Sequence, residues 1–318
     1  MTSPENIPGK VPENILVIKL SALGDFILAM GAMEAIRRHH KGARITLLTT
    51  RPFVDIAERS GWFDDIIIDE RPGFADIKNW YFLFRRFNDG DFLRVYDLQL
   101  NDRTAVYYRL FLKKPEWSGV VKGSRLFYPN PDWREMHAFE RHKEILKLAN
   151  IDVALPDLSW MQADTSPFGL EKPYILMVPG SAPSRPEKRW PALRYGTLAR
   201  KLMKDGFTVA LLGTKAESDV IERVMKTCPG LIDLSGRTSL YDIAALSRNA
   251  AGAVGNDTGP LHLIALSGCP TVALFCTTVS RPAQSAPIGK FVYIVQSEDL
   301  ADISVETVYK SLKPREAA

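Results

Sequence analysis

Residues 250–266 read AAGAVGNDTGPLHLIAL, and this stretch contains three local signals that indicate how the chain folds. The small apolar residues 250–254 predict a buried strand, and Leu263–Leu266 predicts the apolar face of a helix. Two glycines and Pro260 lie between them, where a tight turn and the first turn of a helix are expected. The stretch therefore predicts a strand that passes directly into a helix, which is the repeating unit of a wound parallel sheet.

The same junction is also a candidate anion site. The first turn of a helix has unpaired N–H groups and the positive end of the helix dipole, a combination that suits phosphate. Gly255 and Gly259 let a ligand approach the backbone closely, Thr258 adds a hydroxyl, and His262 follows one turn later. The alternative is an ordinary capped helix, with Asp257 or Thr258 as its N-cap. The residues of this turn leave both interpretations open.

The first half of the chain alternates predicted strands with predicted helices. Strands are expected at 15–20, 44–49, 65–69 and 93–98, and helices at 26–38, 53–60, 75–87, 104–111 and 136–149. Such alternation predicts a parallel sheet with crossover helices.

The pattern lapses over 151–173, a stretch with three prolines and a glycine that we interpret as a linker. Alternation then resumes, with strands expected at 174–178, 208–212, 231–234, 252–254 and 271–275, and helices near 193–205, 217–228 and 240–248. We therefore expect two doubly wound α/β domains facing a central cleft, residues 1–160 and 161–318. The C-terminal helix at 304–312 can pack back on either domain.

Composition and charge set broad limits on function. The chain has 318 residues, 46% hydrophobic and 25% charged, with a formal net charge of +4. These values are typical of a globular protein with two domains. The mild positive charge suits an anionic ligand or a membrane surface, and we expect no nucleic-acid partner.

The cysteines and the apolar runs indicate an intracellular protein. Cys228, Cys269 and Cys276 have no metal-site spacing, so we expect reduced, buried thiols. No apolar run approaches the roughly 18 residues that span a bilayer. Residues 1–14 also lack the pattern of a signal peptide. Any membrane contact is therefore expected to be peripheral.

The loop after the first predicted strand carries Asp25 near the start of a helix. One interpretation is that Asp25 is an N-cap or a favourable partner of the helix dipole. The other is that its carboxylate faces the cleft and acts as a general base. In wound sheets ligands bind beyond the carboxyl ends of the strands, which is where this loop lies.

Two loops of the second half carry further candidates. Residues 178–191 contain Ser181 and Ser184, whose hydroxyls can donate to phosphate, and Lys188, whose ammonium can neutralise it. The alternative is a solvated basic loop. Glu217 follows the next strand, where an acidic residue can accept hydrogen bonds from a ribose diol or serve the first turn of a helix.

Basic residues of the first half are candidates for an anionic acceptor. Arg51 and Arg103 follow predicted strands and can reach the cleft. Residues 81–87 interleave aromatics with arginines; this pattern suits lipid headgroups, although packing of the helix on the sheet also explains it. The sequence has no dinucleotide fingerprint, Walker A motif, nucleophile elbow or zincin spacing.

Three segments together resemble glycosyltransferase family 9, the lipopolysaccharide heptosyltransferases. They are residues 18–25 (IKLSALGD), residues 179–181 (PGS) with 188–191 (KRWP), and residues 256–262 (NDTGPLH), in the family's order. The resemblance spans roughly residues 14–313. It implies the GT-B fold, with two Rossmann-like domains, the acceptor on the first and the nucleotide sugar on the second.

The resemblance also implies a reaction and residue roles. The reaction is an inverting, metal-independent transfer of heptose from ADP-heptose to the inner core of lipopolysaccharide, without a cofactor. Asp25 would be the general base, and Lys188 would hold the donor diphosphate together with Thr258, Gly259 and the helix N-terminus. Glu217 would lie at the ribose, and Asp257 and His262 near the sugar and phosphates. Ser21, Gly24, Arg51 and Arg103 are the expected acceptor-binding residues.

Two departures from the family pattern concern the substrates. This chain has Pro260-Leu261-His262 where members acting on the first core positions often have Leu-Ser-His or Leu-Met-His, and it lacks the paired threonines that some members have before Lys188. These departures leave the donor sugar and the acceptor open. The alternatives to the heptosyltransferase are an enzyme with another nucleotide-sugar donor and a nucleotide-binding homologue without activity. The expected acceptor is an anionic glycolipid, the lipid A–Kdo core. The enzyme is expected as a cytoplasmic monomer in peripheral contact with the inner membrane.

Overall fold

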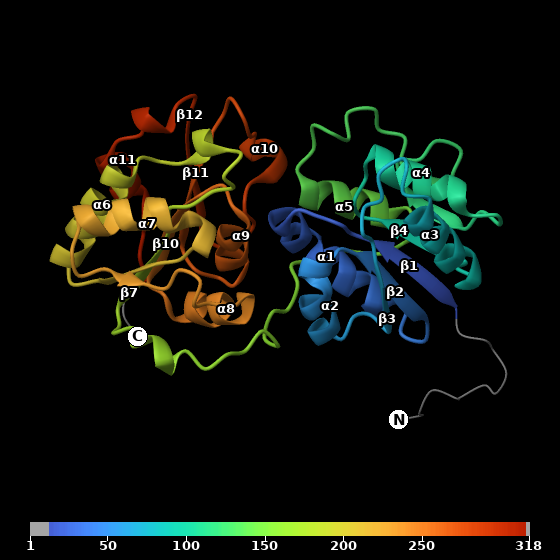
Figure 1. Cartoon of the computed structure of the whole chain (residues 1–318), viewed down its shortest axis with the longest axis horizontal. Helices are drawn as coiled ribbons and strands as arrows, with labels where there is room; N and C mark the ends of the chain where they lie inside the picture. The colour runs from blue at the N-terminus through green and yellow to red at the C-terminus, as the bar shows by residue number, and fades with distance from the viewer. Residues whose placement is uncertain (1–12, 316–318) are drawn as a thin grey trace. The chain divides into compact units, whose positions relative to one another are not determined.

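The computed structural model describes residues 13–315 and divides by internal contacts into two units (Figure 1). Unit 1 holds the described chain up to Ser21, together with Ala29–Pro131 and Glu140–Pro156. Unit 2 holds Ala22–Leu28, Asp132–Phe139 and the described chain from Asp157 onward. Most of the polar N-terminal stretch considered above lies outside the described residues. Between residues 13 and 315, no helix has the length and apolarity needed to cross a membrane.

Unit 1 contains a six-stranded parallel sheet in the order β3-β2-β1-β4-β5-β6. Its strands are β1 (Asn14–Ile18), β2 (Arg44–Thr49), β3 (Asp65–Ile68), β4 (Arg94–Asp97), β5 (Glu116–Gly119) and β6 (Leu126–Phe127). The strand order reverses between β1 and β4, so the loops after these two strands flank the switch point where such sheets place ligands.

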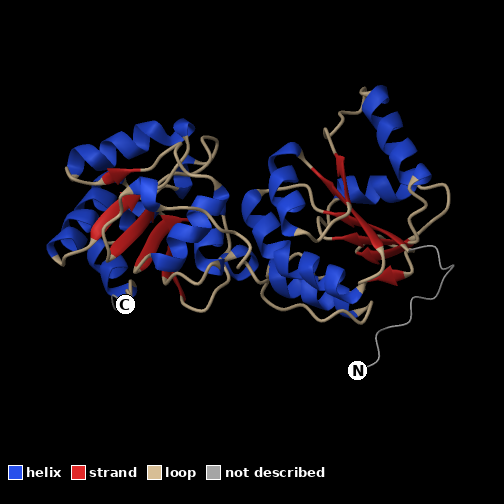
Figure 2. Ribbon diagram, turned by 90° about the horizontal axis from the view of Figure 1, so that it is seen from below, coloured by secondary structure: helices blue, strands red, loops and turns tan. Residues whose placement is uncertain are grey.

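Helices cover both faces of this sheet (Figure 2). They are α1 (Leu23–His39), α2 (Val54–Ser60), α3 (Ile77–Asp89), α4 (Asp102–Leu110) and α5 (Ala138–Lys147). One apolar cluster joins β1 to α3 and α4 through Leu16, Phe87, Tyr107 and Trp117, all essentially inaccessible to solvent. The central strands are apolar on both faces because both are covered.

Unit 2 repeats the architecture, with the order β12-β11-β10-β7-β8-β9 and all pairs parallel. Its strands are β7 (Tyr174–Val178), β8 (Thr208–Leu211), β9 (Ile232–Asp233), β10 (Gly252–Asn256), β11 (Thr271–Cys276) and β12 (Val292–Ser297). Here the order reverses between β10 and β7. The loops after β10 and β7 therefore flank the second switch point.

The helices of unit 2 pack on β7, β8, β10 and β11 through an apolar core that includes Trp190, Leu211 and Val254. They are α6 (Ala192–Lys204), α7 (Ser218–Thr227), α8 (Leu240–Asn249), α9 (Gly259–Leu266), α10 (Pro282–Ser285) and α11 (Val305–Ser311). Helix α11 packs on α6 and β12. Of the two placements open for the C-terminal helix, the structure thus shows packing on its own unit. Cys228, Cys269 and Cys276 are buried free thiols.

The predicted fold class, two wound parallel sheets, is confirmed, and three strands were not predicted. Strand β5 has the sequence EWSG and β6 has two residues, so neither shows an apolar run or alternation. Strand β12 does carry β-branched and aromatic residues at the edge of its sheet, where its side chains are half-buried or exposed. Its pattern was present in the sequence and was overlooked.

Candidate functional site

A cavity of about 360 Å³ lies in unit 2 at the carboxyl end of β10. The start of α1, Ala22–Leu28, is grouped with unit 2 by its internal contacts. Asp25 therefore lines the cavity together with residues more than 150 positions later in the chain. The lining contains both predicted catalytic residues, four predicted donor-binding residues and one predicted acceptor-binding residue: Asp25 and Lys188; Asp257, Thr258, Gly259 and His262; and Gly24. Residues 279–281, 284 and 285 complete the wall.

The start of α9 offers open N–H groups to this cavity. Thr258 occupies the N-cap position, but its side chain makes no capping bond; the hydroxyl donates to the Asn256 carbonyl at 3.2 Å. Asp257 is turned to Lys188 and His262. Of the two predicted N-caps, Thr258 holds the position, but neither side chain caps a helix N–H. Gly259 must be a glycine, because a Cβ there would come within 2.6 Å of the Leu23 side chain. The first turn of α9 therefore keeps the features of an anion site.

Asp257 connects Lys188 with His262. Its Oδ2 accepts from Lys188 Nζ at 2.6 Å, and its Oδ1 lies 3.5 Å from His262 Nε2. Burial raises the pKa of Asp257, but hydrogen bonds from His262 and Lys188 outweigh burial and hold the pKa below its usual value. Asp257 is therefore ionised and keeps the Lys188 ammonium in the cavity, where it remains one-fifth exposed.

Asp25 makes a contact at the start of a helix and also lines the cavity. Helix α1 begins at Leu23, and Asp25 Oδ2 accepts the N–H of Ala22 at 3.2 Å, which is a helix-start contact. The same carboxylate lines the cavity. Gly24 lies against His262, whose ring would be only 3.1 Å from a Cβ at that position. The absence of a side chain at Gly24 lets the start of α1 approach the histidine.

Asn256, which was not predicted as a site residue, fixes the loop that carries Lys188. Its side chain is fully buried at the end of β10 and makes four hydrogen bonds. Oδ1 accepts from Trp190 N and Tyr195 Oη, and Nδ2 donates to the carbonyls of Pro179 and Gly180. The loop between β7 and α6 is thus tied at both ends to the neighbouring strand.

The other predicted donor residues lie away from the cavity lining. Ser181 is buried, its hydroxyl donates to the Arg185 carbonyl, and Arg189 donates to Ser181. Ser184 is exposed on the same loop. Glu217 closes a capping box with Thr214, accepting from its N–H and hydroxyl, which is the helix-start role considered above.

Glu217 has a second contact that bears on the loop after β7. A Cβ at Gly180 would overlap Glu217 Oε1, at 1.9 Å, so Gly180 must be a glycine for the carboxylate to lie there. Its free oxygen is therefore directed to the loop that follows β7.

Three of the four predicted acceptor residues, Ser21, Arg51 and Arg103, lie at the carboxyl edge of the sheet of unit 1. Arg71 donates to the Ser21 hydroxyl, and Arg51 pairs with Glu70. Arg103 donates to the Pro72 carbonyl at 3.3 Å. All three predicted side chains thus contact residues in or beside the loop after β3. Arg71 was missed, although its place directly after a predicted strand was a usable signal.

The loop before Asp25 is hydrogen bonded from both neighbouring strands. Thr49 and Thr50, at the end of β2, donate to the carbonyls of Lys19 and Leu20. On the other side Gln99 Oε1, just after β4, accepts the N–H groups of Leu20 and Ser21 at 2.8 and 3.1 Å. The backbone that leads into α1 is therefore fixed on either side.

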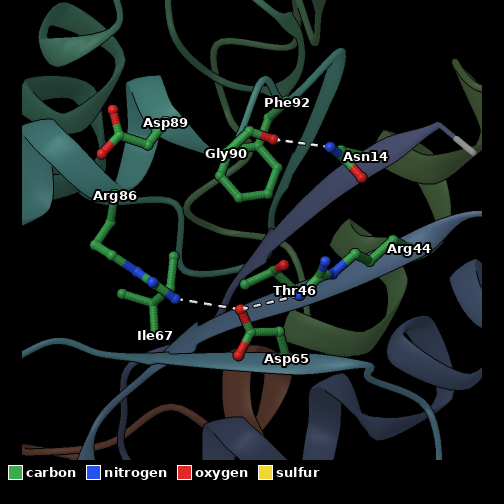
Figure 3. A pocket seen from close by; sticks show the side chains of 9 residues that line it. All are labelled: Asn14, Arg44, Thr46, Asp65, Ile67, Arg86, Asp89, Gly90 and Phe92. Carbon is green, nitrogen blue, oxygen red and sulfur yellow. Dashed lines mark hydrogen bonds and ion pairs between the residues drawn. The ribbon is translucent and has the colours of Figure 1, made fainter. Parts of the chain in front are cut away.

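A second cavity, of about 220 Å³, lies at the opposite, amino edge of the sheet of unit 1 (Figure 3). Arg44 and Arg86 both point to Asp65 there, with N–O distances of 3.9 and 3.2 Å. The charges within this cavity are paired, and it lies away from the carboxyl ends of the strands. We therefore assign it no catalytic role.

Comparison with known proteins identifies the family. The model of glycosyltransferase family 9 (heptosyltransferase) matches residues 80–312. The chain belongs to glycosyltransferase family 9. It is 32% identical over 131 residues to lipooligosaccharide heptosyltransferase 2 of Haemophilus influenzae, a match covering 40% of this chain and 37% of that protein. The matched region thus spans less than two fifths of that relative.

Solved structures share the fold of this family 9 chain. A family 9 glycosyltransferase from Veillonella parvula superimposes with a TM-score of 0.77 at 22% identity, covering 94% of this chain and 95% of that one. ADP-heptose LPS heptosyltransferase II of Escherichia coli gives 0.71 at 22% identity, covering 94% and 97%. The two-sheet α/β architecture is therefore that of the family.

The cavity wall of the family 9 chain includes a segment that sequence reasoning missed. Arg281 and Gln284 line the cavity, and both donate to Glu135 Oε2, at 2.6 and 3.1 Å. They follow β11, and position after a strand was again the available signal. Between residues 13 and 315 no group of three or more His, Cys, Asp or Glu side chains is arranged to hold a metal ion.

Proposed function

We propose that this chain transfers heptose from ADP-heptose to the inner core of lipopolysaccharide, with inversion and without a metal. The observation that carries the proposal is the cavity where Asp25, Lys188 and the uncapped start of α9 meet. A carboxylate, an ammonium and open N–H groups around one space are what a glycosyl transfer from a diphosphate donor needs. Family membership supports the reaction class.

The donor half of the cavity would stabilise the leaving diphosphate. As the bond between the sugar and the phosphate oxygen breaks, that oxygen takes the electron pair and negative charge develops on ADP. The Lys188 ammonium and the N–H groups at Thr258 and Gly259 can bind this charge, which is preorganised electrostatic stabilisation. We assign His262 and Asp257 the task of positioning Lys188, and Glu217 and Ser184 remain proposed contacts of the ribose and the phosphates.

The acceptor half would supply the base. The Asp25 carboxylate removes the proton of the acceptor hydroxyl while that oxygen attacks the anomeric carbon from the face opposite the departing ADP. One carbon–oxygen bond forms as the other breaks, and the proton stays on Asp25. Attack from the opposite face inverts the anomeric configuration.

The acceptor would be an anionic glycolipid, the lipid A–Kdo core. Ser21, Gly24, Arg51 and Arg103 are the proposed contacts, and Arg71 joins them because it holds Ser21. The proposed setting is the cytoplasmic face of the inner membrane, where the enzyme works as a monomer without a cofactor.

Substitution of the base tests the mechanism. Asp25→Asn is expected to abolish release of ADP from ADP-heptose in the presence of acceptor, while ADP binding measured by calorimetry stays near the wild-type value. Asp55→Asn is the matched control, because Asp55 is also a carboxylate in the first turn of a helix. Full transfer activity in Asp25→Asn would overturn the assignment of the base.

The donor is tested separately with alternative nucleotide sugars. Turnover of a UDP-sugar with none of ADP-heptose would favour the second candidate, a related enzyme with another donor. Binding of ADP without release from any donor and acceptor pair would instead indicate a nucleotide-binding homologue without activity.

A further inference from the structure

The steps proposed above leave one side of the cavity in unit 2 without a role. This side is the segment after β11, of which residues 279–281, 284 and 285 line the cavity. We call these five residues the β11 wall. By its contacts the wall belongs to unit 2, as do Asp25 and Lys188. Four of its five side chains carry a hydrogen-bonding group: Ser280, Arg281, Gln284 and Ser285.

The β11 wall is held in place by residues 132–139, which also belong to unit 2. Glu135 Oε2 accepts from Arg281 Nη1 at 2.6 Å and from Gln284 Nε2 at 3.1 Å. Two residues later, His137 Nε2 donates to the Ala286 carbonyl at 2.9 Å. The guanidinium and the amide are thus oriented before a ligand binds, which is what selective recognition requires.

The geometry of the proposed transfer determines which part of the substrates the β11 wall faces. In that transfer the diphosphate lies at Lys188 and the start of α9, and the acceptor hydroxyl lies at Asp25. The sugar must lie between these two ends, because its anomeric carbon carries the leaving oxygen and is attacked from the opposite face. All of these groups line the same cavity of about 360 Å³. The β11 wall, as the remaining side, is therefore the side that contacts the sugar.

The charges of the β11 wall suit a neutral ligand. The Arg281 guanidinium is compensated by the Glu135 carboxylate, and an anionic group bound here would lie beside that carboxylate. Lys188 is also paired with a carboxylate, but there the N–H groups of the eight-residue helix α9 add positive potential. Sugar hydroxyls both donate and accept, so they match the guanidinium, amide and serine groups of the wall.

We propose that Arg281 and Gln284 contact the transferred sugar and determine which sugar the enzyme accepts, with Glu135 as the positioning residue that holds both. The inference rests on the proposed function in that the donor is a nucleotide sugar, but it does not require that the sugar is heptose. Each side chain has donor or acceptor atoms beyond those bound to Glu135, and these bind sugar hydroxyls. A sugar with its hydroxyls elsewhere leaves these groups unpaired, which is the physical basis of the discrimination.

Calorimetry of the full chain with ADP-heptose and with ADP, both without acceptor, tests the inference. Arg281→Ala should weaken ADP-heptose binding by roughly tenfold or more and Gln284→Ala by about fivefold, as expected for the loss of a charged and a neutral hydrogen-bonding group. Neither variant should change the affinity for ADP. Because ADP lacks the sugar, a selective loss of ADP-heptose affinity assigns these side chains to the sugar.

Two variants of Glu135 test its positioning role. Glu135→Ala should also weaken ADP-heptose binding selectively, and Glu135→Gln should recover part of the loss because its carbonyl still accepts from Arg281 and Gln284. A merely structural role would change Tm and leave the ratio of the two affinities unchanged. Lys201→Ala is the matched control, since Lys201 is a cation of unit 2 that is also paired with a glutamate but lies outside the cavity lining. This variant should leave both affinities unchanged.

The outcomes separate this inference from the proposed function. Unchanged ADP-heptose affinity in folded Arg281→Ala and Gln284→Ala overturns the inference, and so does an equal loss of ADP and ADP-heptose affinity. An increased KM for the acceptor with unchanged ADP-heptose affinity overturns it as well, because Arg281 would then contact the acceptor.

A wild type that does not bind ADP-heptose contradicts the proposed donor instead. The variants are then compared on whichever of ADP-glucose, UDP-glucose and GDP-mannose the wild type binds, each against its nucleotide diphosphate. A selective loss of nucleotide-sugar affinity supports the inference although the proposed donor is wrong. A wild type that binds none of these nucleotide sugars overturns both the inference and the proposed function.

Discussion

Replacement of Asn256 by alanine should both destabilise unit 2 and weaken nucleotide binding. The Asn256 side chain is fully buried and makes four hydrogen bonds, at 3.1 and 3.0 Å as acceptor and at 2.8 and 3.1 Å as donor. Alanine removes all four and leaves two backbone carbonyls, one N–H and one tyrosine hydroxyl without these partners. The same bonds hold the loop that carries Lys188.

The expected size follows from the number of bonds lost. At about 1 kcal/mol for each hydrogen bond, Asn256→Ala should lower the free energy of unfolding by roughly 4 kcal/mol. For a unit of this size, each kcal/mol shifts Tm by about 2–4 °C, so Tm should fall by roughly 8–16 °C. Asn256→Asp should lower the free energy of unfolding by at least as much. A carboxylate cannot donate to the Pro179 and Gly180 carbonyls, and its charge would be buried beside them.

Urea unfolding followed by circular dichroism measures the stability, and calorimetry measures ADP affinity at a temperature where the variant is folded. Asn249→Ala is the matched control, since Asn249 is an exposed residue at the end of α8 and should cost less than about 0.5 kcal/mol. A loss below about 1 kcal/mol in Asn256→Ala would refute the reasoning that this amide supports the loop.

Three other substitutions test separate parts of the structure. Lys188→Ala should weaken ADP binding by roughly 10–100-fold in calorimetry, as expected for loss of a charge-assisted contact, and unchanged affinity would remove Lys188 from the site. Gln99→Leu should lower kcat by about tenfold with donor KM nearly unchanged, since it frees the backbone before Asp25; a purely stabilising role would leave kcat intact in the folded variant. Burial raises the pKa of Asp97 to about 6, so the native state binds this proton more tightly than the unfolded chain does. As pH rises from about 4 to 6, Asp97 should therefore lower the free energy of unfolding by up to about 3 kcal/mol. Asp97→Asn should remove this decrease in the free energy of unfolding. Burial lowers the pKa of His40 to about 4, which gives the opposite pH trend in both proteins. Urea unfolding of wild type and variant between pH 4 and 6 therefore isolates the contribution of Asp97.

The central strands could be predicted from sequence because burial on both faces makes them continuous apolar runs. The predictions for β2 and β7 match the structure residue for residue, and α6 was predicted within one residue at each end. The position of Lys188, Asp257 and Asp25 after strands then placed them at carboxyl edges without further information.

Side-chain hydrogen bonds that cross between loops could not be predicted in the same way. Gln99 and Asn256 act on backbone groups 79 and 77 residues away in the chain, and nothing local distinguishes them from other amides. Ser181 carries the hydroxyl expected of a phosphate ligand, yet the fold of its loop turns that hydroxyl to Arg185. Such outcomes depend on tertiary geometry that periodicity does not encode.

The two sheets use the same device at their switch points. In unit 1 an amide just after β4, Gln99, binds the loop that leaves the neighbouring strand β1; in unit 2 an amide at the end of β10, Asn256, binds the loop that leaves the neighbouring strand β7. The first of these loops leads to Asp25 and the second to Lys188. A neutral amide can satisfy buried backbone groups without the desolvation cost of a charge. Because transition-state stabilisation requires groups that are already in place, we infer that both amides serve to preorganise the two proposed reacting ends of the site.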